Sequence, residues 1–215
     1  MIEELLPDAV VTAEAFADPP DPALFPEEEA LIVRAVDKRR REFSTARVLA
    51  RSALATLGFP PAPILRGERG APVWPAGVVG SLTHTTGYRC AAVALDRHVH
   101  SIGIDAEEDA PVPDGVLDAV SDDDERRALA LLAVERPDVH WDRLLFSAKE
   151  SVYKAWFPLT RRWLGFEEAT VAPRPDGTFT ARLLVPGPVV AGHEISGFDG
   201  RWLARDGLLL TAIVL

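Results

Sequence analysis

The sequence predicts an α+β fold, because a helical segment followed by short β-rich runs occurs twice along the chain. With 47% hydrophobic and 26% charged side chains, the 215 residues have the composition of an ordinary globular protein. A chain of this length can form one large core or two cores of about a hundred residues each. We therefore expect two similar α+β halves, residues 1–103 and 104–215, which share an interface because no linker divides them.

In the first half, the prolines and scattered acids of residues 1–25 predict irregular structure. A helix is expected from Pro26, where a first-turn proline and three glutamates suit the positive end of a helix dipole, to Gly58, with room for one break. A loop rich in proline and glycine follows. Three short strands are then predicted at 78–83, 88–95 and 99–105, and Asp96-Arg97-His98 forms the turn between the last two.

The second half is predicted to contain two helices before its strands. Ser121 and the four acids after it indicate a helix start, with the helix running to about Glu135, and a second helix is expected from about His140 to Phe157. Short β-rich runs follow at 179–185, 193–198, 201–205 and 208–214. Asp199-Gly200 and Asp206-Gly207 predict hairpin turns between the last three of these runs.

Composition also excludes several classes of protein. The formal charge of −10 argues against a nucleic-acid binder, and the longest apolar runs fall far short of the roughly 20 residues of a membrane span. The single cysteine, Cys90, excludes an intramolecular disulfide and a multi-cysteine zinc site, and we expect it to be buried. Acids stand near the N-terminus where a secretory signal carries Lys or Arg, so a cytoplasmic location is expected.

One segment is strongly basic in this acidic chain. Residues 34–51 contain seven bases and two acids. Charge alone is compatible with a solvated helix face and with a local anion site, and any anion that this protein binds must meet such a patch.

Two further segments carry candidate chemistry. If the strand after residue 99 continues, Asp105 and Glu107 project from one face and form a bracket for magnesium, although acids at a strand end are often only solvated. In the segment 146–154, Glu150 and Lys154 lie at i and i+4 on one helix face and could meet the same ligand. A surface ion pair, or a capping box that begins at Ser147, would explain the same pattern.

The loop at residues 80–87 follows a predicted strand and collects hydroxyls, glycines and His84. This composition suits a turn that contacts phosphate, and it suits a plain surface turn equally. No Ser/His/Asp spacing indicates a hydrolase triad.

Taken in order, three segments closely resemble the signature of the 4'-phosphopantetheinyl transferases, in particular their monomeric two-half class, and the surrounding residues 38–47, 62–67 and 153–166 resemble its actinobacterial branch. The segments are Gly80-Ser-Leu-Thr-His84, Gly103-Ile-Asp105-Ala-Glu107 and Phe146-Ser-Ala-Lys-Glu150-Ser-Val-Tyr-Lys154. The likeness runs from about residue 26 to the C-terminus. It implies two halves related by a pseudo-twofold axis, an active site in the cleft between them, and a monomer.

The resemblance also implies a reaction, in which coenzyme A donates its phosphopantetheine arm to a serine of an apo acyl, peptidyl or aryl carrier protein and adenosine 3',5'-bisphosphate is released. Such enzymes activate carrier proteins for siderophore, polyketide and nonribosomal peptide synthesis. Asp105, Glu107 and Glu150 would then hold Mg²⁺, with Mn²⁺ as an alternative. Glu150 would be the base for the carrier serine, directly or through a metal-bound water, and Lys154 would stabilise the leaving oxygen or protonate it.

The remaining site residues would bind coenzyme A. Arg39 and Arg47 match positions that grip the 3'-phosphate, Arg66 and His84 lie at the nucleotide end, and Ser81 lies near the phosphates. Many relatives carry Gly-Lys-Pro where this chain has Gly70-Ala71-Pro72, so Arg66 or Arg69 would have to replace that lysine. Two other functions fit the same residues: a magnesium-dependent nucleotide phosphodiesterase, and a non-catalytic module that binds coenzyme A or carrier proteins.

Overall fold

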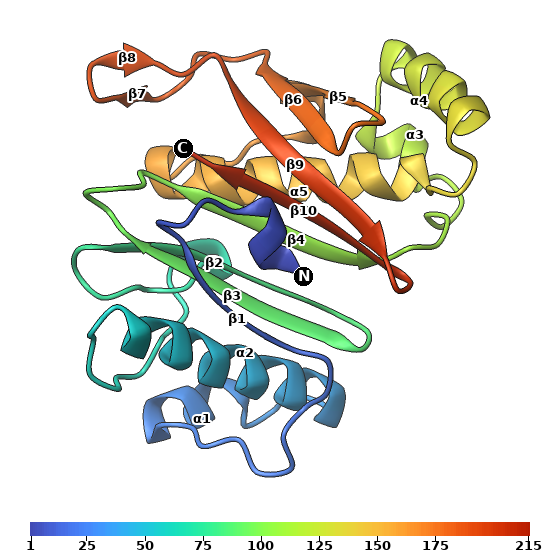
Figure 1. Cartoon of the computed structure of the whole chain (residues 1–215). Helices are drawn as coiled ribbons and strands as arrows, with labels where there is room; N and C mark the ends of the chain where they lie inside the picture. Colours follow the sequence, from blue (N-terminus) through green and yellow to red (C-terminus); the bar gives the residue numbers. More distant parts are fainter.

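The computed structural model describes residues 1–215 and contains two large sheets, each with a long helix along its outer face, and a small sheet of β7 and β8 (Figure 1). The strand order is β1-β3-β2 in the first sheet and β4-β10-β9-β6-β5 in the second, and all pairs of neighbouring strands are antiparallel. In the first half the elements are η1 (Ile2–Leu5), β1 (Val11–Ala15), α1 (Pro26–Ile32), α2 (Asp37–Thr56), η2 (Glu68–Gly70), β2 (Val78–Thr85) and β3 (Tyr88–Leu95). The second half contains β4 (Ile102–Glu108), α3 (Val116–Val120), α4 (Asp123–Glu135), α5 (Trp141–Thr160), η3 (Phe166–Glu168), β5 (Ala169–Pro173), β6 (Thr178–Leu183), β7 (Val189–Val190), β8 (His193–Glu194), β9 (Gly197–Arg205) and β10 (Leu208–Val214).

Successive side chains of a strand point to opposite faces of its sheet, and the apolar side chains are therefore divided among three cores. On β3, Ala91 and Val93 pack against α2, whereas Cys90 and Ala92 belong to a core that both sheets share. Leu209 and Ile213 of β10 belong to a third core, around α5. The predicted α+β class is therefore confirmed, and each long helix lies on its own sheet.

The same alternation decides where the acids of β4 lie. Ile102, Ile104 and Ala106 are buried in the core shared by the sheets, so the residues between them face α5. Asp105 and Glu107 are two of these residues. The first sheet lies alongside β4, and the Ile104 amide donates to the Ser81 hydroxyl of β2 at 3.2 Å.

Several sequence predictions differ from the structure. Residues 1–25 are not irregular throughout, because Val11–Ala15 pairs with β3 as an edge strand. Asp199-Gly200 is not a hairpin turn but lies inside β9, where a Cβ on Gly200 would come within 2.0 Å of the Phe179 ring. That glycine therefore serves close packing. The strand β5 was not predicted from the sequence.

Other predictions are confirmed. The helix after Pro26 breaks once, between Ile32 and Asp37, and Asp206-Gly207 joins β9 to β10. Cys90 is fully buried. The division at residue 103 stays a prediction, and β4 crosses that position. No helix in the structure is both long enough and apolar enough to span a membrane.

Gly103 allows α5 to approach β4 closely. A Cβ at this position would lie 2.0 Å from the Ser151 carbonyl oxygen and 2.8 Å from the Ala155 amide nitrogen. Because both contacts are backbone atoms, Gly103→Ala is expected to push α5 away from β4 and to destabilise the protein by about 1–3 kcal/mol. Urea unfolding tests this, and an unchanged free energy of unfolding would show that the helix shifts without cost.

Candidate active site

A cleft of about 500 Å³ opens between the two helix-on-sheet units. One wall consists of α2, β2 and the loop 66–74, and the other wall is the C-terminal half of α5. This volume lies within the usual range of small-molecule sites.

The cleft is cationic, although the whole chain carries a formal charge of −10. Glu150 is the only acidic residue in its lining. Its bases are Arg39, Arg47, Arg66, Arg69, Lys154 and Arg161, with His84 and His100 beside them. Such a concentration of positive charge in a concave site attracts a polyanion such as a nucleotide.

Arg47 is held rigidly in the first wall of the cleft, which contains α2. It is 5% exposed, its Nε donates to the Ile64 carbonyl at 2.9 Å, and its guanidinium lies 4.1 Å from the centre of the Phe43 ring. Burial and the nearby arginines, including Arg66, lower the pKa of Arg47 to about 10, against the opposing effect of Glu28. An anion in the cleft would relieve this repulsion.

His84 and Arg39 form a second polar pair in the cleft. Arg39 NH1 lies 2.8 Å from His84 Nε2. A guanidinium can only donate, so Nε2 accepts and the ring is neutral with its proton on Nδ1. Burial lowers the pKa of His84, the nearby charges of Arg39 and Lys154 lower it further, and only Glu42 opposes them.

Two further bases of the segment, Arg40 and Arg51, serve the fold, whereas Arg34, Lys38 and Arg41 are exposed. Arg51 NH1 pairs at 2.7 Å with Glu28, which is fully buried and also accepts from the Ile64 amide at 2.9 Å. Arg40 donates to the Ile32 carbonyl at 2.7 Å. The segment 34–51 is therefore neither a uniform solvated face nor a uniform anion patch, because Arg39 and Arg47 alone among its bases line the cleft.

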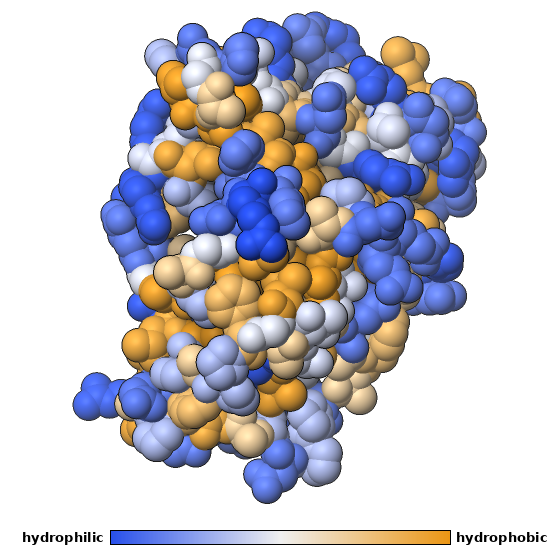
Figure 2. Space-filling view, turned by 60° about the vertical axis from the view of Figure 1, so that its left-hand side comes forward, coloured by the Kyte–Doolittle hydropathy of each residue, from blue (hydrophilic) through white to orange (hydrophobic).

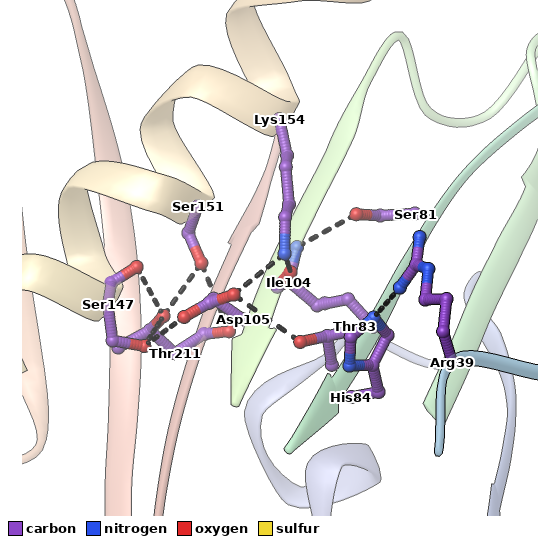
Figure 3. Close-up of polar contacts among 10 residues, drawn as sticks. All are labelled: Arg39, Ser81, Thr83, His84, Ile104, Asp105, Ser147, Ser151, Lys154 and Thr211. Carbon is purple, nitrogen blue, oxygen red and sulfur yellow. Dashed lines mark hydrogen bonds and ion pairs between the residues drawn. The ribbon is translucent and has the colours of Figure 1, made fainter. Parts of the chain in front are cut away.

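Asp105 is the centre of a polar network between β4 and α5 (Figure 3). Lys154 Nζ lies 2.7 Å from Asp105 Oδ1 and donates to the Ile104 carbonyl at 3.0 Å. Ser147 donates to Asp105 Oδ2 at 2.9 Å, and Thr83 lies 3.4 Å from Oδ1. Asp105 is 5% exposed and stands behind Lys154, outside the cleft lining itself.

The other two candidate metal ligands have different surroundings. Glu107 Oε2 accepts from Arg143 NH1 at 2.9 Å, whereas Glu150 makes no hydrogen bond with the protein and lines the cleft. Burial raises the pKa of both glutamates, and the charge of Asp105 raises each of them further. No three His, Cys, Asp or Glu side chains are already grouped closely enough to hold a metal ion.

All the residues predicted to bind coenzyme A line the cleft, namely Arg39, Arg47, Arg66, Ser81, His84 and Lys154. The capping-box alternative is wrong, because Ser147 lies in the second turn of α5, which begins at Trp141. Arg161 was not predicted from the sequence as a site residue, and Arg69 was predicted only as an alternative to Arg66. Both line the cleft, and Arg69 lies 5.5 Å from the Trp163 ring.

Two family profiles match consecutive parts of the chain. The 4'-phosphopantetheinyl transferase N-terminal domain matches residues 27–94, and the 4'-phosphopantetheinyl transferase superfamily matches residues 101–201. Together they span the two walls of the cleft.

Three curated relatives match over nearly their whole length. The chain is 61% identical to 4'-phosphopantetheinyl transferase Svp of Streptomyces mobaraensis, over all of this chain and 89% of Svp. It belongs to the 4'-phosphopantetheinyl transferase superfamily. This transferase is also 54% identical to Npt of Nocardia iowensis over 99% of each chain, and 50% identical to PptT of Mycobacterium tuberculosis over 94% of this chain and 91% of PptT. The resemblance seen in the sequence is thereby confirmed.

Proposed function

We propose that this transferase moves the 4'-phosphopantetheine arm of coenzyme A to a serine of an apo carrier protein and releases adenosine 3',5'-bisphosphate. The observation that carries the proposal is the cationic cleft with Glu150 as its one acid and Lys154 one helical turn away. Coenzyme A is a polyanion, and the transfer needs a base and a cation near its pyrophosphate. An intact-mass assay of an apo carrier protein tests the proposal, and its outcomes are given at the end of the Discussion.

Coenzyme A would bind through the arginines of the first wall. The buried Arg47 and the Arg39–His84 pair suit the 3'-phosphate, while Arg66 would lie at the nucleotide end and Ser81 nearer the phosphates. Arginine supplies charge-assisted, often bidentate bonds to phosphate. The bound phosphate would also relieve the repulsion among the cleft cations.

Arg47→Ala is expected to raise KM for coenzyme A about tenfold or more while kcat changes little, as for the loss of a charged hydrogen bond in uniform binding. With dephospho-coenzyme A, which lacks the 3'-phosphate, the same substitution should change KM far less. Arg182→Ala, at an exposed position on β6, serves as the control. Equal losses with both substrates would move the 3'-phosphate site away from Arg47.

The donor set between β4 and α5 has the chemistry of a divalent metal site, although its three carboxylates would have to move closer together to bind one ion. Asp105, Glu107 and Glu150 offer hard oxygen ligands, and the charge of Asp105 raises the pKa of both glutamates, as expected for carboxylates that repel one another. The Glu150 carboxylate would break no hydrogen bond with the protein when it bound a metal ion. In Glu107, Arg143 bonds to Oε2, so Oε1 remains free to bind the ion. Mg²⁺ bound there would neutralise charge on the pyrophosphate.

Transfer requires one bond to form and one to break. The carrier serine oxygen bonds to the phosphorus that bears pantetheine, and the bond from that phosphorus to the bridging oxygen breaks. Glu150 would take the serine proton, and its raised pKa brings it closer to neutral pH than an ordinary glutamate. Lys154 would stabilise the negative charge on the leaving oxygen.

The carrier protein would make local contacts around the cleft mouth. The enzyme carries a net charge of −10, so long-range attraction to an acidic carrier is not available. Figure 2 shows apolar residues gathered in a band between hydrophilic margins on one face of the molecule, a surface that suits local contact. Both walls of the cleft come from one chain, which supports the prediction of a monomer. The cytoplasmic location stays a prediction.

A further inference from the structure

Ser147 is one of two fully buried serines on the face of α5 that packs against β4 and β10. Ser147 and Ser151 are one helical turn apart, and both contact the Thr211 hydroxyl, at 3.0 Å and 2.7 Å. Ser147 alone also reaches a carboxylate, at 2.9 Å from Asp105 Oδ2 (Figure 3).

The hydroxyl group of Ser147 can donate its hydrogen bond to only one of its partners. A carboxylate only accepts, so the hydroxyl of Ser147 donates to Asp105. Thr211 must then donate toward Ser147, whose hydroxyl and carbonyl oxygens both lie 3.0 Å away. Ser151 in turn donates to Thr211. Every hydroxyl in this buried chain is satisfied, and the chain ends on Asp105.

The chain restricts the orientation of the Asp105 carboxylate. Oδ1 faces Lys154 and Thr83, and Oδ2 faces Ser147, so the two oxygens are held from opposite sides. A carboxylate has about four acceptor positions, and Ser147 uses only one of the two on Oδ2. The other position has no hydrogen-bond partner in the protein, and a metal ion would bind there.

From these contacts we infer that Ser147 is a positioning residue, which orients Asp105 for metal binding through its single hydrogen bond. This inference rests on the proposed function, because it takes Asp105 as a metal ligand. Partners that orient ligands typically change metal affinity about 10–100-fold when they are removed.

The test compares two matched serines. Mn²⁺ is titrated into the protein with coenzyme A and without carrier protein, and the free Mn²⁺ signal is followed by electron paramagnetic resonance. Ser147→Ala is expected to weaken Mn²⁺ binding about 10–100-fold, while Ser151→Ala, which removes an equally buried hydroxyl without a carboxylate contact, leaves the affinity within about twofold of wild type. In turnover, Ser147→Ala should lower kcat with KM for coenzyme A unchanged.

Thermal unfolding separates positioning from packing, because both serine variants lose one buried hydroxyl group. If both lower Tm alike but bind Mn²⁺ like wild type, Ser147 only packs the helix and the inference is wrong. If Ser147→Ala does not fold, Ser147→Cys keeps the volume with a weaker donor and should show an intermediate loss of Mn²⁺ affinity. If wild type binds no Mn²⁺ in the presence of coenzyme A, the metal assignment in the proposed function fails, and this inference fails with it.

Discussion

Replacing Glu150 with Gln is expected to lower kcat for transfer about 10²–10⁴-fold, the usual contribution of a general base. The fold should be unaffected, because the Glu150 carboxylate accepts no hydrogen bond from the protein and Gln has nearly the same shape. The measurement is the initial rate of carrier modification at saturating coenzyme A, together with Tm.

The control for this substitution is Glu108→Gln, at an exposed acid at the end of β4. It removes the same charge close to the site without touching the cleft lining, so its rate should equal that of wild type. Near-normal turnover in Glu150→Gln would remove Glu150 from the mechanism, whatever the control shows.

The two lysines of the motif on α5 are expected to have opposite roles. Lys154 contacts Asp105 and lines the cleft, so Lys154→Met should lower kcat about 10²–10³-fold with a small change in Tm. Lys149 is 3% exposed and pairs with the buried Glu125 at 2.9 Å. Lys149→Met leaves that carboxylate buried and unpaired and should therefore cost about 3–5 kcal/mol of stability.

Lys154→Met should thus lower turnover with little effect on stability, whereas Lys149→Met should lower stability. Tm from thermal unfolding and kcat at saturating substrates decide this directly. A Lys154 variant that turns over normally would leave the leaving oxygen without its proposed cation. A Lys149 variant with unchanged Tm would show that water reaches Glu125.

The helices α1, α2, α4 and α5 could be predicted because their signals are local, whereas α3 and β5 were not predicted. Pro26 with its three glutamates and the acids after Ser121 mark helix starts, and Asp206-Gly207 marks a true hairpin. The strand at 11–15 could not be predicted in this way, because it is held by pairing with β3, far away in the sequence. Asp199-Gly200 has the composition of a turn, but the Phe179 ring that explains Gly200 comes from another strand.

The same difference between local signals and distant partners applies to the residues of the site. Family motifs indicated Arg39, Arg47 and Lys154, which the fold brings to one cleft. The roles of Arg40 and Arg51 depend on Ile32 and Glu28, partners that no spacing within the basic segment reveals. The stripe of Arg143, Ser147 and Lys154 on α5 can be recognised only once the helix is known to face β4.

Transfer of phosphopantetheine is measured most directly by the intact mass of an apo carrier protein after incubation with this enzyme, coenzyme A and Mg²⁺. We expect a mass gain of one phosphopantetheine group that disappears in EDTA. No gain on acyl, peptidyl or aryl carriers with coenzyme A intact would contradict it and favour a binding module. Cleavage of coenzyme A without carrier modification would contradict it in favour of a phosphodiesterase.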